Sequence, residues 1–99
     1  LNTEKNYYKK VNSLMNLIYV DLVVYSKGKD VDKLKKEQEE WLNTQKELFD
    51  LVCSKQELLI HGVQSEIDIM VGYAELSELV ELRIIALIRN LKQKEILDN

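Results

Sequence analysis

Hydrophobic residues recur along much of the chain at intervals of three and four, which is the spacing of one face of an α-helix. Two stretches show this spacing most regularly, one near each end of the chain. The first has apolar side chains at Tyr7, Val11, Leu14, Ile18, Leu22 and Tyr25, and the second at Ile69, Tyr73, Leu76, Val80, Ile84, Leu87 and Leu91. The pattern predicts helices over about 3–25 and 66–96, each with one face buried against a neighbour.

Between these stretches, one row of apolar residues recurs every seven positions, at Leu34, Trp41 and Leu48, and a second row follows one position further on, at Leu42 and Phe49. Together they form an apolar stripe on a charged helix. Neither glycine nor proline interrupts residues 31–60, so one helix of roughly 45 Å is predicted there. We expect the large apolar surface of Trp41 to be buried in the core, the alternative being an exposed anchor for a partner.

Two short segments separate the predicted helices. In 26–30, Gly28 suits a left-handed position beyond a helix end, and Asp30 can cap the helix that follows. The second segment is 61–65, where Ser65 and Asp68 form the pattern of a capping box at the start of the third helix. Both connections are short, which favours antiparallel packing of consecutive helices.

The fold class follows from these helices and from the scarcity of turn residues. The chain has 99 residues with no proline and three glycines. We therefore predict a single all-α domain over 1–99, an antiparallel bundle of three long helices. Gly72 lies inside the third helix, where glycine costs about 1 kcal/mol relative to alanine. It marks either a close crossing of two helices or a break of the third helix into two.

The sequence lacks the residue patterns of common catalytic and metal sites. The one cysteine, Cys53, and the one histidine, His61, exclude an internal disulfide framework and the usual zinc sites. We expect Cys53 to be a small buried hydrophobic residue and assign no chemistry to His61. No phosphate-binding loop or nucleophile elbow is present. The chain is therefore expected to be non-enzymatic, without a cofactor or metal.

Charge is distributed unevenly behind a net charge of −3. Residues 1–36 contain eight lysines and four acidic residues, whereas 56–82 contain six acidic residues and no lysine or arginine. An acidic surface there disfavours nucleic acid and anionic membranes and attracts a basic partner. Alternatively, the basic first helix lies alongside and neutralises it. The most apolar run, 14–25, is too short and too interrupted by polar residues to span a membrane.

The stretch 34–49 resembles a helix of the LprI-like lysozyme inhibitors, a family of small secreted bacterial proteins. Its Leu-x-x-x-Gln-x-x-Trp-Leu pattern is matched by Leu34, Gln38, Trp41 and Leu42. Further on, Gly62 and the run 74–78 are similar to a Gly-Ser turn and an acidic helix of that family, and the resemblance covers about residues 31–85.

This chain also departs from the pattern of that family. The Arg-Asp pair of the family falls on Gln45 and Lys46, and its two cysteines fall on Phe49 and Gly72. A large and a small residue thus replace two cysteines together, and we expect Phe49 to fill the space over Gly72.

The resemblance implies a binding protein that covers a basic enzyme such as lysozyme with acidic side chains. The residues expected to bind such a partner are Glu66, Asp68, Glu75, Glu78 and Glu81. It also implies a secreted, periplasmic or lipid-anchored protein, whereas a cytoplasmic location is expected without it. The chain starts at Leu1 rather than methionine, so any signal peptide would precede it.

The alternative is a structural or assembly module that pairs with itself or with a partner helix. The stretches Leu17–Val24 and Leu82–Ile88 are apolar on more sides than three helices can bury. Excess apolar surface of this kind is typical of interaction sites. We therefore expect a homodimer that buries both stretches, with Asp21 and Arg83 at its rim.

Overall fold

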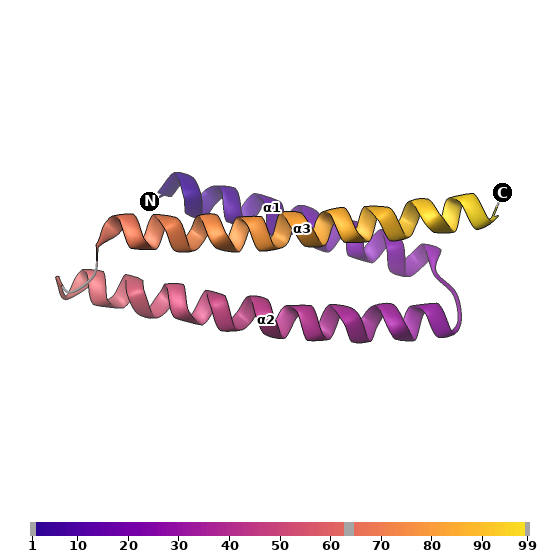
Figure 1. The fold of residues 1–99 in the computed structure, drawn as a ribbon, viewed down its shortest axis with the longest axis horizontal. Coiled ribbons are helices and arrows are strands. Elements are labelled where there is room, and N and C mark those ends of the chain that lie inside the picture. Colours follow the sequence, from indigo (N-terminus) through magenta and orange to yellow (C-terminus); the bar gives the residue numbers. More distant parts are fainter. Residues whose placement is uncertain (1, 63–64, 99) are drawn as a thin grey trace.

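The computed structural model describes residues 2–62 and 65–98, which form three long helices: α1 (Asn2–Tyr25), α2 (Lys29–Ile60) and α3 (Glu66–Asp98) (Figure 1). The molecule is elongated, measuring 57 × 22 × 14 Å along its principal axes. No strand occurs in either described range. The all-α prediction is confirmed, and the helix ends lie within two residues of those expected from the sequence.

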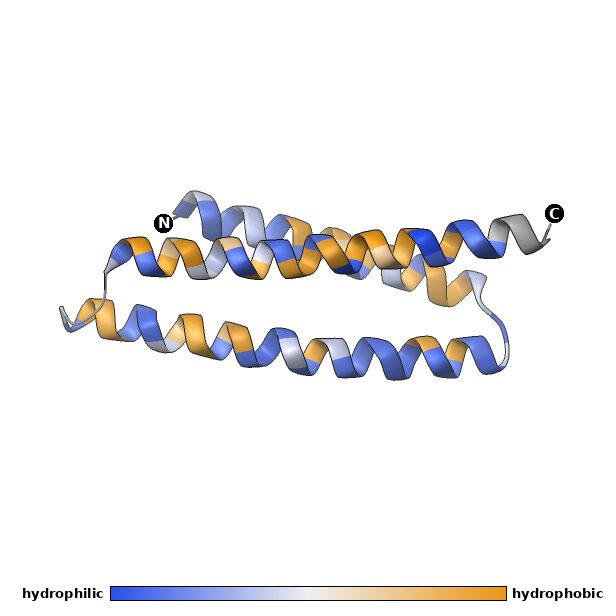
Figure 2. Cartoon of the chain, in the orientation of Figure 1, coloured by the Kyte–Doolittle hydropathy of each residue, from blue (hydrophilic) through white to orange (hydrophobic). Residues whose placement is uncertain are grey.

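Consecutive helices are antiparallel, so α1 and α3 run in the same direction. These two parallel helices lie side by side and share the most extensive contact of the bundle, whereas α2 contacts mainly α3 (Figure 1). The middle of α3 is predominantly hydrophobic, and the half of α2 that begins at Lys29 is predominantly hydrophilic (Figure 2). The pair α1–α3 therefore forms the apolar body of the bundle, with α2 along one side of it.

The core confirms the predicted face of α3 and corrects that of α1. Ile69, Tyr73 and Leu76 are buried in α3 as expected, with Val80 and Leu87 further along the helix. In α1 the buried residues are Tyr8, Val11, Met15 and Leu22, whereas Tyr7, Leu14 and Tyr25 of the predicted face are exposed. The buried face of α1 is rotated because this helix packs against α3 on one side and meets α2 on another.

The buried side of α2 also differs from the predicted stripe. Trp41 and Leu48 are half-buried against the core, so Trp41 is a core residue with part of its surface in solvent. Leu42 and Phe49, the predicted second row, are exposed. The second row that is buried consists instead of the residues four positions after Leu34, Trp41 and Leu48. Its members are Gln38, Gln45 and Val52. Cys53, next to Val52, is exposed and not buried as predicted, because Val52 takes the inward position.

The turns before α2 and before α3 match the predictions from the sequence only in part. Gly28 has φ +60°, a region that other residues rarely adopt. However, α2 starts at Lys29 without a side-chain cap, so Asp30 lies in its first turn and the prediction that Asp30 caps the helix is wrong. At α3, the Ile67 N–H donates to Ser65 Oγ over 3.1 Å, as expected for an N-cap.

Gly72 marks a close helix crossing, and α3 continues through it unbroken. A Cβ at this position would lie 2.7 Å from Val52 Cγ2, and its three nearest neighbours all belong to Val52. The prediction that Phe49 fills this space is therefore wrong. The ring of Phe49 instead stacks on Tyr8, with 6.1 Å between the ring centroids.

Candidate interaction surface

A layer of buried polar side chains joins α2 to the other helices. Gln38 Nε2 donates to Met15 Sδ over 3.2 Å, and Arg83 Nε donates to Gln38 Oε1 over 2.8 Å. Two turns further along α2, Gln45 Nε2 donates to Tyr8 Oη over 2.9 Å and to Asn12 Oδ1 over 2.7 Å. Buried polar groups need such partners, and the resulting network fixes one position of α2 along the bundle.

Arg83 is the charged member of this layer. Burial lowers the pKa of its guanidinium, and the nearby Glu37 carboxylate opposes that effect. The side chain of Arg83, which was expected at the rim of a dimer, is directed to α2 and bound by Gln38. The layer was not predicted from the sequence because glutamine is rarely buried. The signal was the seven-residue spacing of Gln38, Gln45 and Val52.

Two buried tyrosines take part in this layer. Burial raises the pKa of Tyr8 and of Tyr73, so the fold favours their protonated phenols. Tyr73 Oη donates to Gln56 Oε1 over 3.0 Å, a further link between α3 and α2. Across residues 2–62 and 65–94, no group of three histidine, cysteine or carboxylate side chains is placed to hold a metal ion. The hydrogen bonds of this layer link α2 to α1 and to α3.

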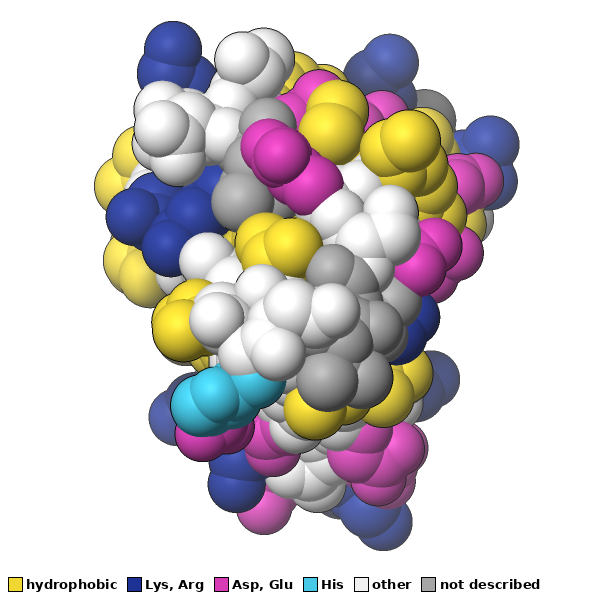
Figure 3. All heavy atoms as spheres, turned by 90° about the vertical axis from the view of Figure 1, so that its left-hand side faces the viewer, with side chains coloured by type: hydrophobic (Ala, Val, Ile, Leu, Met, Phe, Trp, Pro, Cys, Tyr) yellow, Lys and Arg dark blue, Asp and Glu magenta, His cyan; other side chains and the backbone are white. Residues whose placement is uncertain are grey.

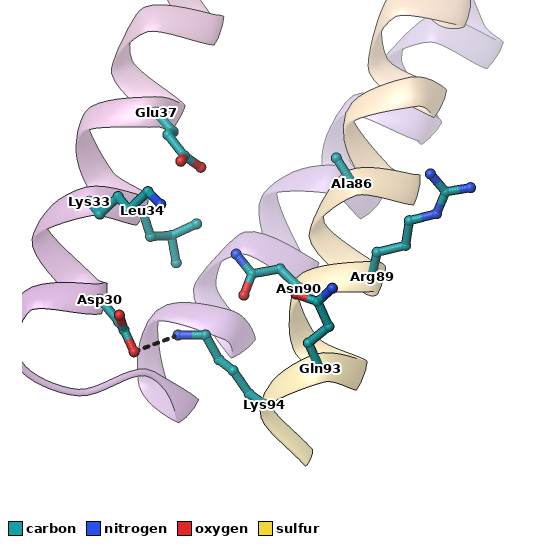
Figure 4. Close-up of a pocket in the computed structure, with 9 residues that line it drawn as sticks. All are labelled: Asp30, Lys33, Leu34, Glu37, Ala86, Arg89, Asn90, Gln93 and Lys94. Atoms are coloured by element: carbon teal, nitrogen blue, oxygen red, sulfur yellow. Dashed lines mark ion pairs between the residues drawn. The ribbon is translucent and has the colours of Figure 1, made fainter. Parts of the chain in front are cut away.

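A hollow of about 470 Å³ lies between the start of α2 and the last turns of α3 (Figure 4). Lys94 reaches across it, donating to Ser26 Oγ over 2.6 Å and lying 3.8 Å from Asp30 Oδ2, whereas Arg89 points away from α2. Its lining mixes both signs of charge: Asp30, Lys33, Leu34, Glu37, Ala86, Arg89, Asn90, Gln93 and Lys94. These contacts tie the end of α3 to the turn between α1 and α2.

The five acidic residues proposed as a binding site are all exposed but do not gather on one side of α3. Asp68 and Glu75 are seven residues apart and share a side of the helix, whereas Glu81 is directed to α1 and accepts a hydrogen bond from Tyr7 Oη over 3.0 Å. Seen along the bundle from the end where α3 begins, acidic side chains are interspersed with apolar and basic ones (Figure 3). Glu66, Asp68, Glu75, Glu78 and Glu81 thus face more than one direction around α3.

A more continuous surface lies on the side of α1 and α3 that is opposite α2. Asn12 and Arg83 are directed to α2, and Leu14 and Ile85 each follow two residues later, about 200° further round the helix. On this side a hydrogen bond between Tyr7 and Glu81 joins α1 to α3. Leu14 lies two turns beyond Tyr7 on α1, and Ile85 lies one turn beyond Glu81 on α3. Because α1 and α3 are parallel, their exposed apolar residues follow the same seam.

We call this surface the outer face. On α1 it comprises Lys10, Leu14, Leu17 and Asp21, and on α3 Glu78, Glu81, Ile85, Ile88 and Lys92, all of them exposed. In its centre Leu14 is 49 % exposed, Leu17 66 %, Ile85 46 % and Ile88 39 %. Val20 and Leu82 extend the exposed apolar area on either side. Only part of the predicted stretches 17–24 and 82–88 is available in this way, since Leu22 and Leu87 are buried in the core.

None of the three helices has a described stretch both long and apolar enough to cross a lipid bilayer. Comparison of the chain with protein-family models, with curated proteins and with solved structures found no match.

Proposed function

We propose that this chain is a non-enzymatic helical interaction module that binds another apolar helical surface with its outer face. The observation that carries the proposal is the exposure of Leu14, Leu17, Ile85 and Ile88 at the centre of that face. Large apolar side chains that lie next to one another on a surface are typical of interaction sites. Burial of such surface contributes roughly 25 cal/mol per Å², which favours association once enough of it is covered.

The arrangement of the helices supports the same proposal. Two parallel helices in contact present a shallow seam between them, and a further helix or helix pair laid along it completes a four-helix arrangement. The other side of the α1–α3 pair is already occupied, because α2 is fixed there by Gln38 and Gln45. The outer face is thus the side of the bundle that a partner would complete.

The test compares the parent chain with the double variant Leu17→Glu/Ile85→Glu. Burying two uncompensated carboxylates in a contact is unfavourable, so association should weaken at least about tenfold, whereas circular dichroism should stay helical. Sedimentation measures association, and the fluorescence of an apolar dye measures whether the face binds apolar groups at all. The control is Leu51→Glu/Leu58→Glu, which changes two exposed apolar residues of α2. A parent that neither associates nor binds dye contradicts the proposal, as does a double variant that behaves like the control.

A basic protein is the second candidate partner, because Glu66, Asp68, Glu75, Glu78 and Glu81 are all exposed. Complementary charge raises the association rate and makes binding sensitive to salt. Titration calorimetry with lysozyme at low salt should then give heat that shrinks as salt is added. The triple variant Glu75→Gln, Glu78→Gln and Glu81→Gln should bind more weakly while keeping its helix. Absence of heat and of inhibition at low salt would leave the outer face as the only candidate.

A further inference from the structure

The α1 part of the outer face is a short stripe with opposite charges at its two ends. Lys10, Leu14, Leu17 and Asp21 follow one another at intervals of four, three and four, which is the spacing of a helix seam that packs against another helix. All four side chains are exposed. A second copy of this stripe in the opposite direction would place each lysine against an aspartate and each leucine against a leucine.

The α3 part has the same property with the charges reversed. Glu78, Glu81, Ile85, Ile88 and Lys92 follow at intervals of three, four, three and four, and all are exposed. The asymmetry extends beyond the stripe. From Glu66 to Leu82 the helix has five acidic residues and no basic one, and from Arg83 to Lys94 it has four basic residues and no acidic one. Two copies of α3 therefore attract each other when antiparallel and repel when their acidic halves are side by side.

The two stripes have their centres at the same level of the bundle. Two hydrogen bonds set the register of α1 against α3. Lys94 bonds to Ser26, which is 68 positions earlier in the chain, and Glu81 bonds to Tyr7, which is 74 positions earlier. By these offsets Ile85, the centre of the α3 stripe, is level with a residue between positions 11 and 17. The centre of the α1 stripe, between Leu14 and Leu17, lies within that range. One two-fold axis perpendicular to the helices can therefore cross both stripes.

We propose that the partner of the outer face is a second copy of this chain, packed antiparallel about such an axis. The proposal rests on the proposed function and names its partner. Lys10 meets Asp21 of the second copy, Glu78 meets Lys92 of the second copy, and Ile85 meets its own counterpart. The α1 and α3 helices of both copies form a four-helix core, with each α2 on the outside.

The first test is disulfide formation at the two-fold axis. A disulfide needs Cα atoms within about 4.4–6.8 Å, which only a residue close to the axis can satisfy with its own counterpart. In a Cys53→Ser background, Ile85→Cys should give a covalent dimer under mild oxidation. Leu51→Cys in the same background, an exposed position on α2, is the matched control and should remain monomeric. Equal yields from the two variants would overturn the proposed axis.

The second test distinguishes the two directions of pairing. Glu78→Lys and Lys92→Glu should each weaken dimerisation about 2- to 20-fold, because each removes two symmetry-related attractions and adds repulsion. The double variant should dimerise like the parent, since the charges are exchanged in both copies. If the copies ran in the same direction, α3 would face α1 of the second copy and the exchange would not restore dimerisation. Failure of the double variant would therefore overturn the antiparallel arrangement.

The outcomes separate this inference from the proposed function. A parent that binds the apolar dye but remains monomeric at tens of micromolar overturns the second copy as partner and leaves the outer face as a binding site. A parent that dimerises without the cross-link at residue 85 overturns the axis alone. A parent without dye binding or association overturns both.

Discussion

The two sides of the α1–α3 pair differ in what their side chains contact. On the inner side α2 is held by hydrogen bonds of Gln38, Gln45 and Gln56, alongside its buried Leu34 and Val52. The outer face has apolar side chains at its centre that stay between 39 % and 66 % exposed among the described residues. A helix on the same chain is already at high local concentration, so directional hydrogen bonds suffice to fix its position. A partner bound at the proposed outer face would be held mainly by burial of its apolar side chains.

The hydrogen bond of Arg83 offers the strongest way to break the inner side. Gln38→Leu removes the carbonyl that accepts from Arg83 Nε and leaves a half-buried cation with one partner fewer. The free energy of unfolding should fall by about 1.5–3 kcal/mol, the usual contribution of a hydrogen bond to a charged group. Urea unfolding measures it, and Gln38→Leu/Arg83→Leu should recover most of the loss. Gln93→Leu, the same change at an exposed glutamine, should stay within about 0.5 kcal/mol of the parent.

A close contact at Gly72 allows a second test of the inner side. Gly72→Leu should lower the free energy of unfolding by about 1–3 kcal/mol through overpacking, because a Cβ there already meets Val52 Cγ2 at 2.7 Å. Thermal melting should show a smaller penalty when Val52→Ala is added and no relief when Phe49→Ala is added. Relief by Phe49→Ala instead would restore the contact expected from the sequence and contradict the packing described above.

Alkaline pH provides a milder test of the same interface. Burial raises the pKa of Tyr8 and Tyr73, so the fold favours the protonated phenols. Their contribution to stability is complete below the ordinary tyrosine pKa of about 10 and is lost as pH rises through that value and towards the raised one. Urea midpoints should therefore fall above this pH. The decline should be shallower in Tyr8→Phe, and an identical decline in that variant would show that Tyr8 does not contribute to it.

The sequence predicted the fold well because helix ends depend on local signals. Hydrophobic periodicity, the Gly28 turn and the Ser65 cap each act within a few residues, and the helices end within two residues of where these signals place them. The side of each helix that is buried depends on distant residues. Leu14 was assigned to the core, yet α2 approaches α1 from the side of Asn12, and this leaves Leu14 exposed.

The candidate surface was predicted only in outline for the same reason. The excess of apolar residues in 17–24 and 82–88 was visible, but the sequence could not show which of them face outward. Buried glutamines further concealed the inner face of α2, because a row of Gln38 and Gln45 reads as solvent-exposed by composition. Only the partners of these amides, Met15, Tyr8 and Arg83, reveal that the row is internal.

Amide hydrogen exchange at low and at high protein concentration tests most directly whether the outer face binds a partner copy while α2 is already satisfied. Association should slow exchange in α1 around Leu14–Leu17 and in α3 around Ile85–Ile88 as concentration rises, because exchange there then requires the dimer to open. Exchange in α2 should not change. Protection that rises in α2 instead, or that is independent of concentration throughout, would contradict the assignment of the outer face.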